Sequence, residues 1–229
     1  MYRVPSRARP RQPARRKPTE QRRAEIVAAA REIALADGLD SVTLRRIADA
    51  LGVFPGLVSH YFPSVGDLVA EAFGDVMTHD RDETFAMIQA AAPAYLLRMR
   101  ELLHYMLSDD RDRISLLWLD AWHGARQRPA LQAELVAQMR AWDSRLAAMI
   151  QAGVGTGEFH TADALLAAGR ILATVDGLTV VAAIKSAIDN SAVGDLVIAT
   201  AERELGLRQG QLNRTGPSAR CASGPPAAD

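Results

Sequence analysis

The chain has 229 residues, 48% of them apolar, which is enough for one large or two modest domains with a substantial core. Aromatic residues make up only 5% and Ala and Leu dominate, which favours packed helices over sheets. The net charge is zero, yet residues 1–17 hold six Arg and one Lys without an acid. A single cysteine, Cys221, excludes a disulfide framework and a Cys-based zinc site. No stretch matches a signal peptide or a membrane span, so we expect a cytoplasmic protein without membrane contact.

Residues 1–18 alternate Arg, Pro, Ala and Gln, and this composition cannot bury enough apolar surface to become ordered. We therefore expect a disordered basic arm. Two interpretations stay equally open: the arm lies in a DNA minor groove, or it is a solvated tail. A first helix follows to about Asp37, with Thr19 as its N-cap and Gly38 as its end.

Residues 43–62 carry the most informative pattern in the chain. Thr43 is suited to cap a short helix through its hydroxyl oxygen, and Gly52 ends that helix because glycine enters the left-handed region cheaply. Pro55 suits the first position of a second helix, where its missing N–H costs nothing. Two short helices around a glycine turn form a helix-turn-helix, whose second helix is available to a DNA major groove. The first helix has one apolar stripe at helical spacing, made of Leu44, Ile47, Ala48 and Leu51.

Two arginines stand at an unfavourable place in this motif. Arg45 and Arg46 lie in the first turn of a helix, beside the positive end of its dipole, where each costs a few tenths to about 1 kcal/mol. A DNA phosphate at this helix start would turn the cost into a gain. We favour that interpretation over two solvated guanidinium groups.

The segments ADGLDSVTLRRIADALGV and GLVSHYFPSVGDLVAEAF resemble the DNA-binding domain of TetR-family transcriptional regulators over residues 19–78. GLVSHYF is similar to the BetI-like, choline-responsive branch in particular. The resemblance implies an all-α protein of about nine helices, in which a three-helix DNA-binding domain precedes a larger ligand-binding and dimerisation domain. It assigns DNA contacts to the helix starts and to the outer face of the third helix, which here carry Thr43, Arg45, Gly56, Leu57, Ser59, His60 and Tyr61.

The chain departs from the family pattern at three positions. Members commonly have Ser or Thr at Phe54, and Lys at Pro55 and Val65. Phe54 has no capping oxygen, so a backbone N–H is left free for a phosphate, or its ring contacts a thymine methyl group instead. Tyr61, with Phe62 beside it, more often closes the small core than touches DNA. We add Arg46, Phe54 and Pro55 to the expected DNA-binding residues.

The remaining chain stays helical. Ser64 is expected to cap a long helix that ends near Met87, and WLDAWHGARQRPALQAE, IQAGVGTGEF and ILATVDGL resemble the BetI-like regulatory domain. Further helices are expected near residues 93–107, 112–126, 129–153, 161–187 and 192–205. We divide the chain into a basic arm (1–18), a TetR-type DNA-binding domain (19–78), a regulatory and dimerisation domain (79–205) and a disordered tail (206–229).

The last two helices carry small and apolar residues spaced by three and four. This spacing serves a seam between subunits or a seam inside one subunit equally well. The family forms a four-helix dimer interface here, and a dimer suits a palindromic double-stranded operator, so we favour the dimer. The expected interface residues are Leu165, Ala168, Leu172, Val175, Thr179, Ala182, Val197 and Ala201.

An effector pocket is expected in the regulatory domain. Aromatic faces with a carboxylate suit a cationic or amphipathic small molecule, although a plain core role is the commoner one for any single residue. Asp176 stays open between a pocket acid and a hydrogen-bonded polar group. The expected pocket residues are Met99, Trp118, Trp122, His123, Trp142 and Asp176.

The predicted function is a homodimeric, sequence-specific DNA-binding regulator, expected to be a repressor that a small-molecule effector releases. The alternative is a helical binding protein of the same fold that no longer reads DNA. The five histidines show no His-Glu-x-x-His spacing, and neither a Gly-x-Ser-x-Gly motif nor a phosphate-binding glycine loop occurs. We therefore predict no catalytic residue, no metal and no cofactor.

Overall fold

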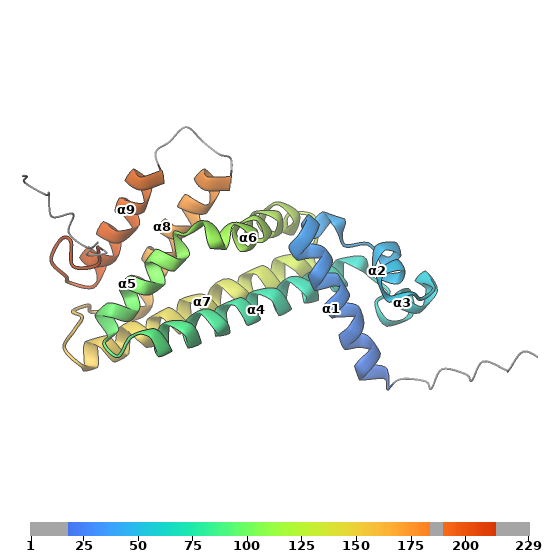
Figure 1. Ribbon diagram of the computed structural model, residues 1–229, viewed down its shortest axis with the longest axis horizontal. Coiled ribbons are helices and arrows are strands. Elements are labelled where there is room, and N and C mark those ends of the chain that lie inside the picture. The colour runs from blue at the N-terminus through green and yellow to red at the C-terminus, as the bar shows by residue number, and fades with distance from the viewer. Residues whose placement is uncertain (1–17, 184–189, 214–229) are drawn as a thin grey trace, which may run out of the picture.

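The computed structural model describes residues 18–183 and 190–213, and its regular structure over these ranges is all helical, as predicted (Figure 1). None of the helices in these ranges is long and apolar enough to cross a membrane. The helices are α1 (Thr19–Asp37), η1 (Leu39–Ser41), α2 (Leu44–Leu51), α3 (Pro55–Tyr61), α4 (Val65–Ala91), α5 (Tyr95–Met106), η2 (Asp109–Arg111), α6 (Asp112–Ala125), α7 (Pro129–Gly155), α8 (Ala164–Ala183) and α9 (Asn190–Glu204).

Two long helices, α4 and α7, lie side by side and form the axis of the molecule (Figure 1). A small polar network holds them in register. The side-chain amide of Gln138 on α7 donates to the Thr78 hydroxyl of α4 at 3.0 Å, and Arg81 of α4 donates to the Gln138 carbonyl oxygen at 2.8 Å. Since α4 also starts in the N-terminal domain, it connects the head formed by α1–α3 to the rest of the chain.

Two apolar cores divide the molecule. The first joins α1–α4 to α6 and the start of α7, and it includes Ile26, Phe73 and Leu117. The second joins α5, the end of α7, α8 and α9. Trp118 of α6 packs against both cores, and its ring meets Phe73 edge to face at 5.4 Å between centroids. Trp118 therefore contacts both cores at their boundary.

Two predictions about helix ends were wrong. Pro18, not Thr19, occupies the N-cap of α1, and none of the described side chains caps that helix. The long helix α4 continues past Met87 to Ala91. By contrast, Ser64 caps α4 by accepting the backbone N–H of Asp67 at 3.3 Å, as expected.

The expected disordered tail does not begin at residue 206. Residues 206–213 fold back on the second core, and Leu212 is fully buried. The buried carboxylate of Glu202 explains this, because it accepts the backbone N–H groups of Gly210 at 2.9 Å and Leu212 at 2.8 Å. The His104 ring nitrogen adds a 3.2 Å bond to the Leu212 carbonyl. The predictions for residues 1–17 and 214–229, with Cys221, lie outside the described residues.

Candidate functional site

The helix-turn-helix is built by the local rules that its sequence suggested. Thr43 Oγ1 accepts the Arg46 backbone N–H at 3.2 Å, which caps α2. Gly52 ends α2 in the left-handed region, with φ 64° and ψ 37°, a conformation that side chains with a Cβ rarely adopt. Pro55 is the first residue of α3. The turn therefore presents α3 as a short separate helix at one end of the molecule (Figure 1).

One face of α3 is buried and the opposite face is open. Val58 is completely buried in the first core, and Tyr61 packs partly against the same core. Phe54 at the N-cap is 87% exposed, and Pro55, Gly56 and His60 are exposed too. The other expected contact residues of α3, Leu57 and Ser59, are half-buried. The arrangement leaves the start of α3 and the His60 side free to meet another molecule.

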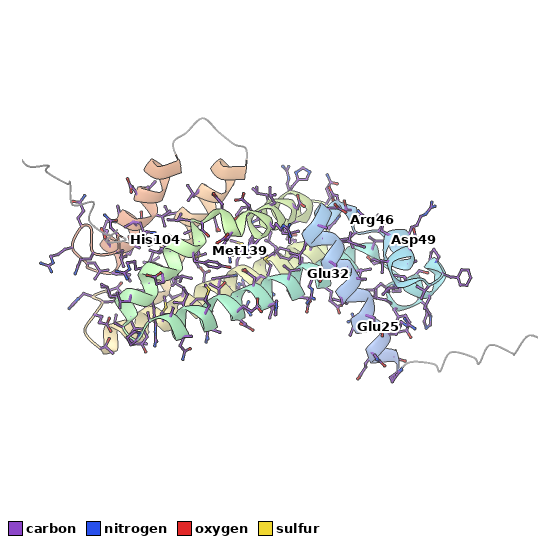
Figure 2. The ribbon with its side chains drawn as sticks, in the orientation of Figure 1. Glu25, Glu32, Arg46, Asp49, His104 and Met139 are labelled. Carbon is purple, nitrogen blue, oxygen red and sulfur yellow. The ribbon has the colours of Figure 1, made fainter. Side chains whose placement is uncertain are left out.

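The two arginines of α2 differ in their surroundings. Arg46 pairs with Asp37 at the end of α1, so its unfavourable place at the helix start is compensated inside the protein. The spacing within α2 did not indicate this pair, because Asp37 belongs to another helix. The Arg45 side chain is 88% exposed and lies 4.0 Å from Asp49, itself exposed (Figure 2). Arg45, together with exposed Thr43, remains available to a phosphate.

The head is attached to α6 through η1. Oδ2 of Asp120 on α6 accepts the backbone N–H of Leu39 at 2.9 Å. The carboxylate lies over Gly38, whose φ is 85°, and a Cβ there would come within 2.7 Å of the same oxygen. A second link joins Arg128 and Asp40 at 2.8 Å across an exposed surface. The side chain of Asp120 thus connects the regulatory helices to the segment that leads into α2.

A cavity of about 150 Å³ lies between α5, η2, α6, α7 and α8. Trp118 and Trp142 supply aromatic walls, and Asp143 and Asp176 line the same space. Met139, near the middle of the molecule in Figure 2, completes one side. The Trp142 side chain is 5% exposed, and its indole N–H is buried without an acceptor among the described residues. The cavity therefore combines apolar faces with groups that lack protein partners.

The charges around this cavity are uneven. Arg111 also lines it, but both of its outer nitrogens are used by the Asp80 carboxylate at 2.7 and 2.9 Å. Neither Asp143 nor Asp176 has an ion-pair partner among the described residues. Burial, and after it the charge of Asp143, raise the pKa of Asp176 to about 6, and burial also raises the pKa of Asp143. Within the described part of the chain, no basic group therefore neutralises the two carboxylates of this cavity.

The structure divides the six expected pocket residues into two groups. Trp118, Trp142 and Asp176 line the cavity. The other three do not line it: Met99 is completely buried in the second core, Trp122 packs against the first core, and His123 is exposed. Helical spacing alone could not separate these cases. Sequence reasoning also missed Arg111 and Asp143, although the place of Asp143 next to Trp142 was a usable signal.

Most of the expected dimer residues belong to the subunit's own core. These residues lie on the sides of α8 and α9 that pack against each other and against α7 within the same chain, as in the intramolecular alternative. Thr179 and Ala182 have side chains outside the described part of the structure, and Leu165 is 58% exposed. Buried within the subunit, and therefore wrongly assigned, are Ala168, Leu172, Val175, Val197 and Ala201.

A different stripe of α8 and α9 is open. Leu166 is 50% exposed, Val180 is 40% exposed, and Ala173 and Gly177 lie between them on the exposed side of α8. On α9, Leu196 is 57% exposed, and Ala199 follows it on the exposed side. We call these six exposed apolar and small residues of the two helices the α8–α9 face.

Comparison with known proteins agrees with this architecture. Residues 26–72 match the family described as bacterial regulatory proteins, tetR family, and residues 97–206 match the BetI-type transcriptional repressor C-terminal family. The HTH-type transcriptional regulator BetI of Cronobacter sakazakii is 28% identical over 151 residues, which are 64% of this chain and 72% of that protein.

Solved structures share the fold. A protein described as a TetR-family transcriptional regulator from Rhodococcus sp. has a TM-score of 0.66 at 22% identity, over 82% of this chain and 100% of the other. A transcriptional regulator from Saccharomonospora viridis, solved in complex with choline, has a TM-score of 0.65 at 21% identity, over 82% and 98%. Regulators of this family bind DNA and are not enzymes, which agrees with the lack of catalytic motifs in the sequence. The two matched segments together span most of the chain, which therefore belongs to the TetR family of transcriptional regulators and has a BetI-type C-terminal domain.

Proposed function

We propose that the protein is a homodimeric repressor that binds a palindromic operator and is released from it by a small organic cation. The observation that carries the proposal is the double role of α6. Trp118 on this helix forms a wall of the cavity, and Asp120, two residues further along, holds the head through Leu39. The proposal places the protein in the cytoplasm, where an operator is accessible.

The path from cavity to head is short. A ligand that contacts Trp118 changes the packing of α6 between the two cores, and the Asp120 carboxylate moves with that helix. The hydrogen bond between the Asp120 carboxylate and the Leu39 N–H then either pulls the head along or breaks. An effector acts only through the difference between its affinities for the two head positions, and this difference is typically about 1–3 kcal/mol.

The chemistry of the cavity favours a cation. Asp143 and Asp176 are two carboxylates without a counter-ion among the described residues, and the nearby Arg111 charge is already neutralised by Asp80. A cation between the two carboxylates would offset the cost of removing them from water. The indole faces of Trp118 and Trp142 would add cation–π attraction. Choline, found in the Saccharomonospora viridis relative, is a suitable first probe.

The α8–α9 face supports the dimer. Its apolar residues repeat at intervals of seven along α8, as Leu166, Ala173 and Val180 do, so two copies of the helix can pack lengthwise. The small residues between them allow a close approach of the two backbones. Two heads related by a two-fold axis would then meet successive major grooves, about 34–36 Å apart.

The test begins with the selection of bound fragments from a random duplex pool, which should yield a palindromic site. In gel-shift titrations, His60→Ala and Arg45→Ala should each weaken operator binding while light scattering still finds a dimer. Arg113→Ala, which removes an exposed arginine from α6, is the matched control and should leave binding unchanged. A monomer that ignores duplex DNA of every sequence at low salt would instead support the alternative of a helical binding protein.

A further inference from the structure

The leading edge of α3 has no side chain that can make a hydrogen bond. Phe54 at the N-cap is followed by Pro55, Gly56 and Leu57. Phe54 is the most exposed large apolar residue in the described part of the chain. A Cβ built on Gly56 would meet no atom within 4 Å. A partner can therefore approach this edge closely, but it meets only apolar groups.

The rest of α3 offers little for hydrogen-bonded base recognition. Ser59 uses its hydroxyl to donate to the Gly56 carbonyl at 3.2 Å, and Tyr61 packs partly against the core. His60 remains as the exposed polar side chain of this helix. The long side chains that read purines with two hydrogen bonds, namely Arg, Lys, Asn and Gln, are absent from Pro55–Tyr61.

Within residues 18–183 and 190–213, Phe54 makes no core contact that would explain its presence. Neighbouring apolar residues of the motif, such as Val53 and Phe62, pack in or against the first core, whereas Phe54 takes no part in either core. The residues that begin a recognition helix are the ones that reach base edges in helix-turn-helix complexes. In the major groove, the group that an apolar side chain recognises is the C5 methyl of thymine.

We propose that Phe54 selects a thymine in each operator half-site by packing its ring on the C5 methyl group. This inference rests on the proposed DNA-binding function and deepens it, because it names the base and the atom that are read. The contact buries one methyl group against an aromatic ring that is otherwise solvated. Removal of that methyl should weaken binding roughly fourfold for one half-site and about 15-fold for both.

The experiment uses the full-length protein and the selected operator. Each thymine is replaced in turn by deoxyuridine, which removes only the C5 methyl group and keeps the base pair. At one symmetric position the wild-type protein should show the fourfold and 15-fold losses. Phe54→Ala should bind the thymine operator more weakly and should no longer distinguish thymine from deoxyuridine there. Its melting temperature should stay unchanged, because the removed ring is 87% exposed.

Two further arms make the result specific. At the same position, an operator with 5-methylcytosine paired to guanine should bind wild type more tightly than one with plain cytosine, by the same factor. Met87→Ala removes an exposed apolar side chain from α4, far from the motif in sequence, and should keep the full response to the methyl group.

The possible failures are distinguishable. If the protein binds its operator but tolerates deoxyuridine at every thymine, or if Phe54→Ala loses the same factor on both operators, the inference about Phe54 is wrong and the DNA-binding proposal survives. If no duplex is bound at any salt concentration, the proposed function fails and the inference fails with it.

Discussion

Replacement of Asp120 by alanine should uncouple the cavity from the head. The carboxylate accepts the backbone N–H of Leu39 at 2.9 Å, and the Leu39 side chain is 1% exposed. In Asp120→Ala this N–H loses its acceptor, and Gly38 loses the group that fills the space above it. The bond is charge-assisted but only partly buried, so we expect a loss of about 1.5 kcal/mol in the free energy of unfolding. For a chain of this size, the melting temperature should fall by about 3–6 °C.

The same variant should respond less to effector. In wild type, the cation that the cavity binds best in a screen of choline and related amines should lower operator affinity, by a factor in the range of about 5–150 that is common for such coupling. In Asp120→Ala the factor should approach one while cation affinity stays close to wild type. Calorimetry measures cation binding, and fluorescence anisotropy of a labelled operator measures release.

Two comparisons make this prediction sharp. Asp120→Asn keeps a carbonyl oxygen that can accept from Leu39, so most of the coupling should remain. Arg128→Ala breaks the exposed pair with Asp40, which contributes less than about 1 kcal/mol, and it should change little. If Asp120→Ala has the same melting temperature as wild type and releases its operator at the same cation concentration, the coupling route through Leu39 is refuted.

Three other tests concern the cavity, the Asp80–Arg111 ion pair and the dimer. The pKa of Asp176 is raised to about 6, so this carboxyl is mostly neutral below pH 6 and mostly ionised above it. Cation affinity should therefore fall about tenfold from pH 7 to pH 5. In calorimetric titrations, Asp176→Asn should remove most of this pH dependence. Asp80→Ala leaves the buried Arg111 charge unpaired, so chemical denaturation should show a loss of about 3–5 kcal/mol in the free energy of unfolding. Adding Arg111→Met should restore most of this stability. An Asp80→Ala variant as stable as wild type would contradict the role of the pair. Leu166→Glu places a charge on the α8–α9 face and should give a monomer in light scattering, whereas a persistent dimer would move the interface elsewhere.

Much of the local structure was readable from single residues. Thr43, Gly52, Pro55 and Ser64 act on their own helix ends, through one hydrogen bond or one backbone conformation, and the structure shows each of them doing so. Such effects involve neighbours within four residues, so the sequence carries them directly. The Phe54 position could likewise be marked as unusual, because its lack of a capping oxygen is a property of the side chain alone.

Contacts between distant segments were decided only by packing. Asp37 compensates Arg46 from the end of another helix, and Asp143 and Arg111 reach the Trp118 cavity from separate elements. Nothing in the spacing along one helix predicts a neighbour on a second helix, because that neighbour depends on how the two pack in three dimensions. The two carboxylates of the cavity, which have no ion-pair partner among the described residues, come together only when α7 and α8 are packed against each other.

The faces of α8 show the division most clearly. Ala168, Leu172 and Val175 are spaced by four and three residues, and Leu166 and Ala173 of the opposite stripe are spaced by seven, the sum of the same two steps. The sequence by itself determined that α8 is a helix with apolar residues at three- and four-residue spacing. Which side turns to the core was settled by the second core, because the inner stripe is the one that fits against α7 and α9, and the other was left to solvent or to a second subunit.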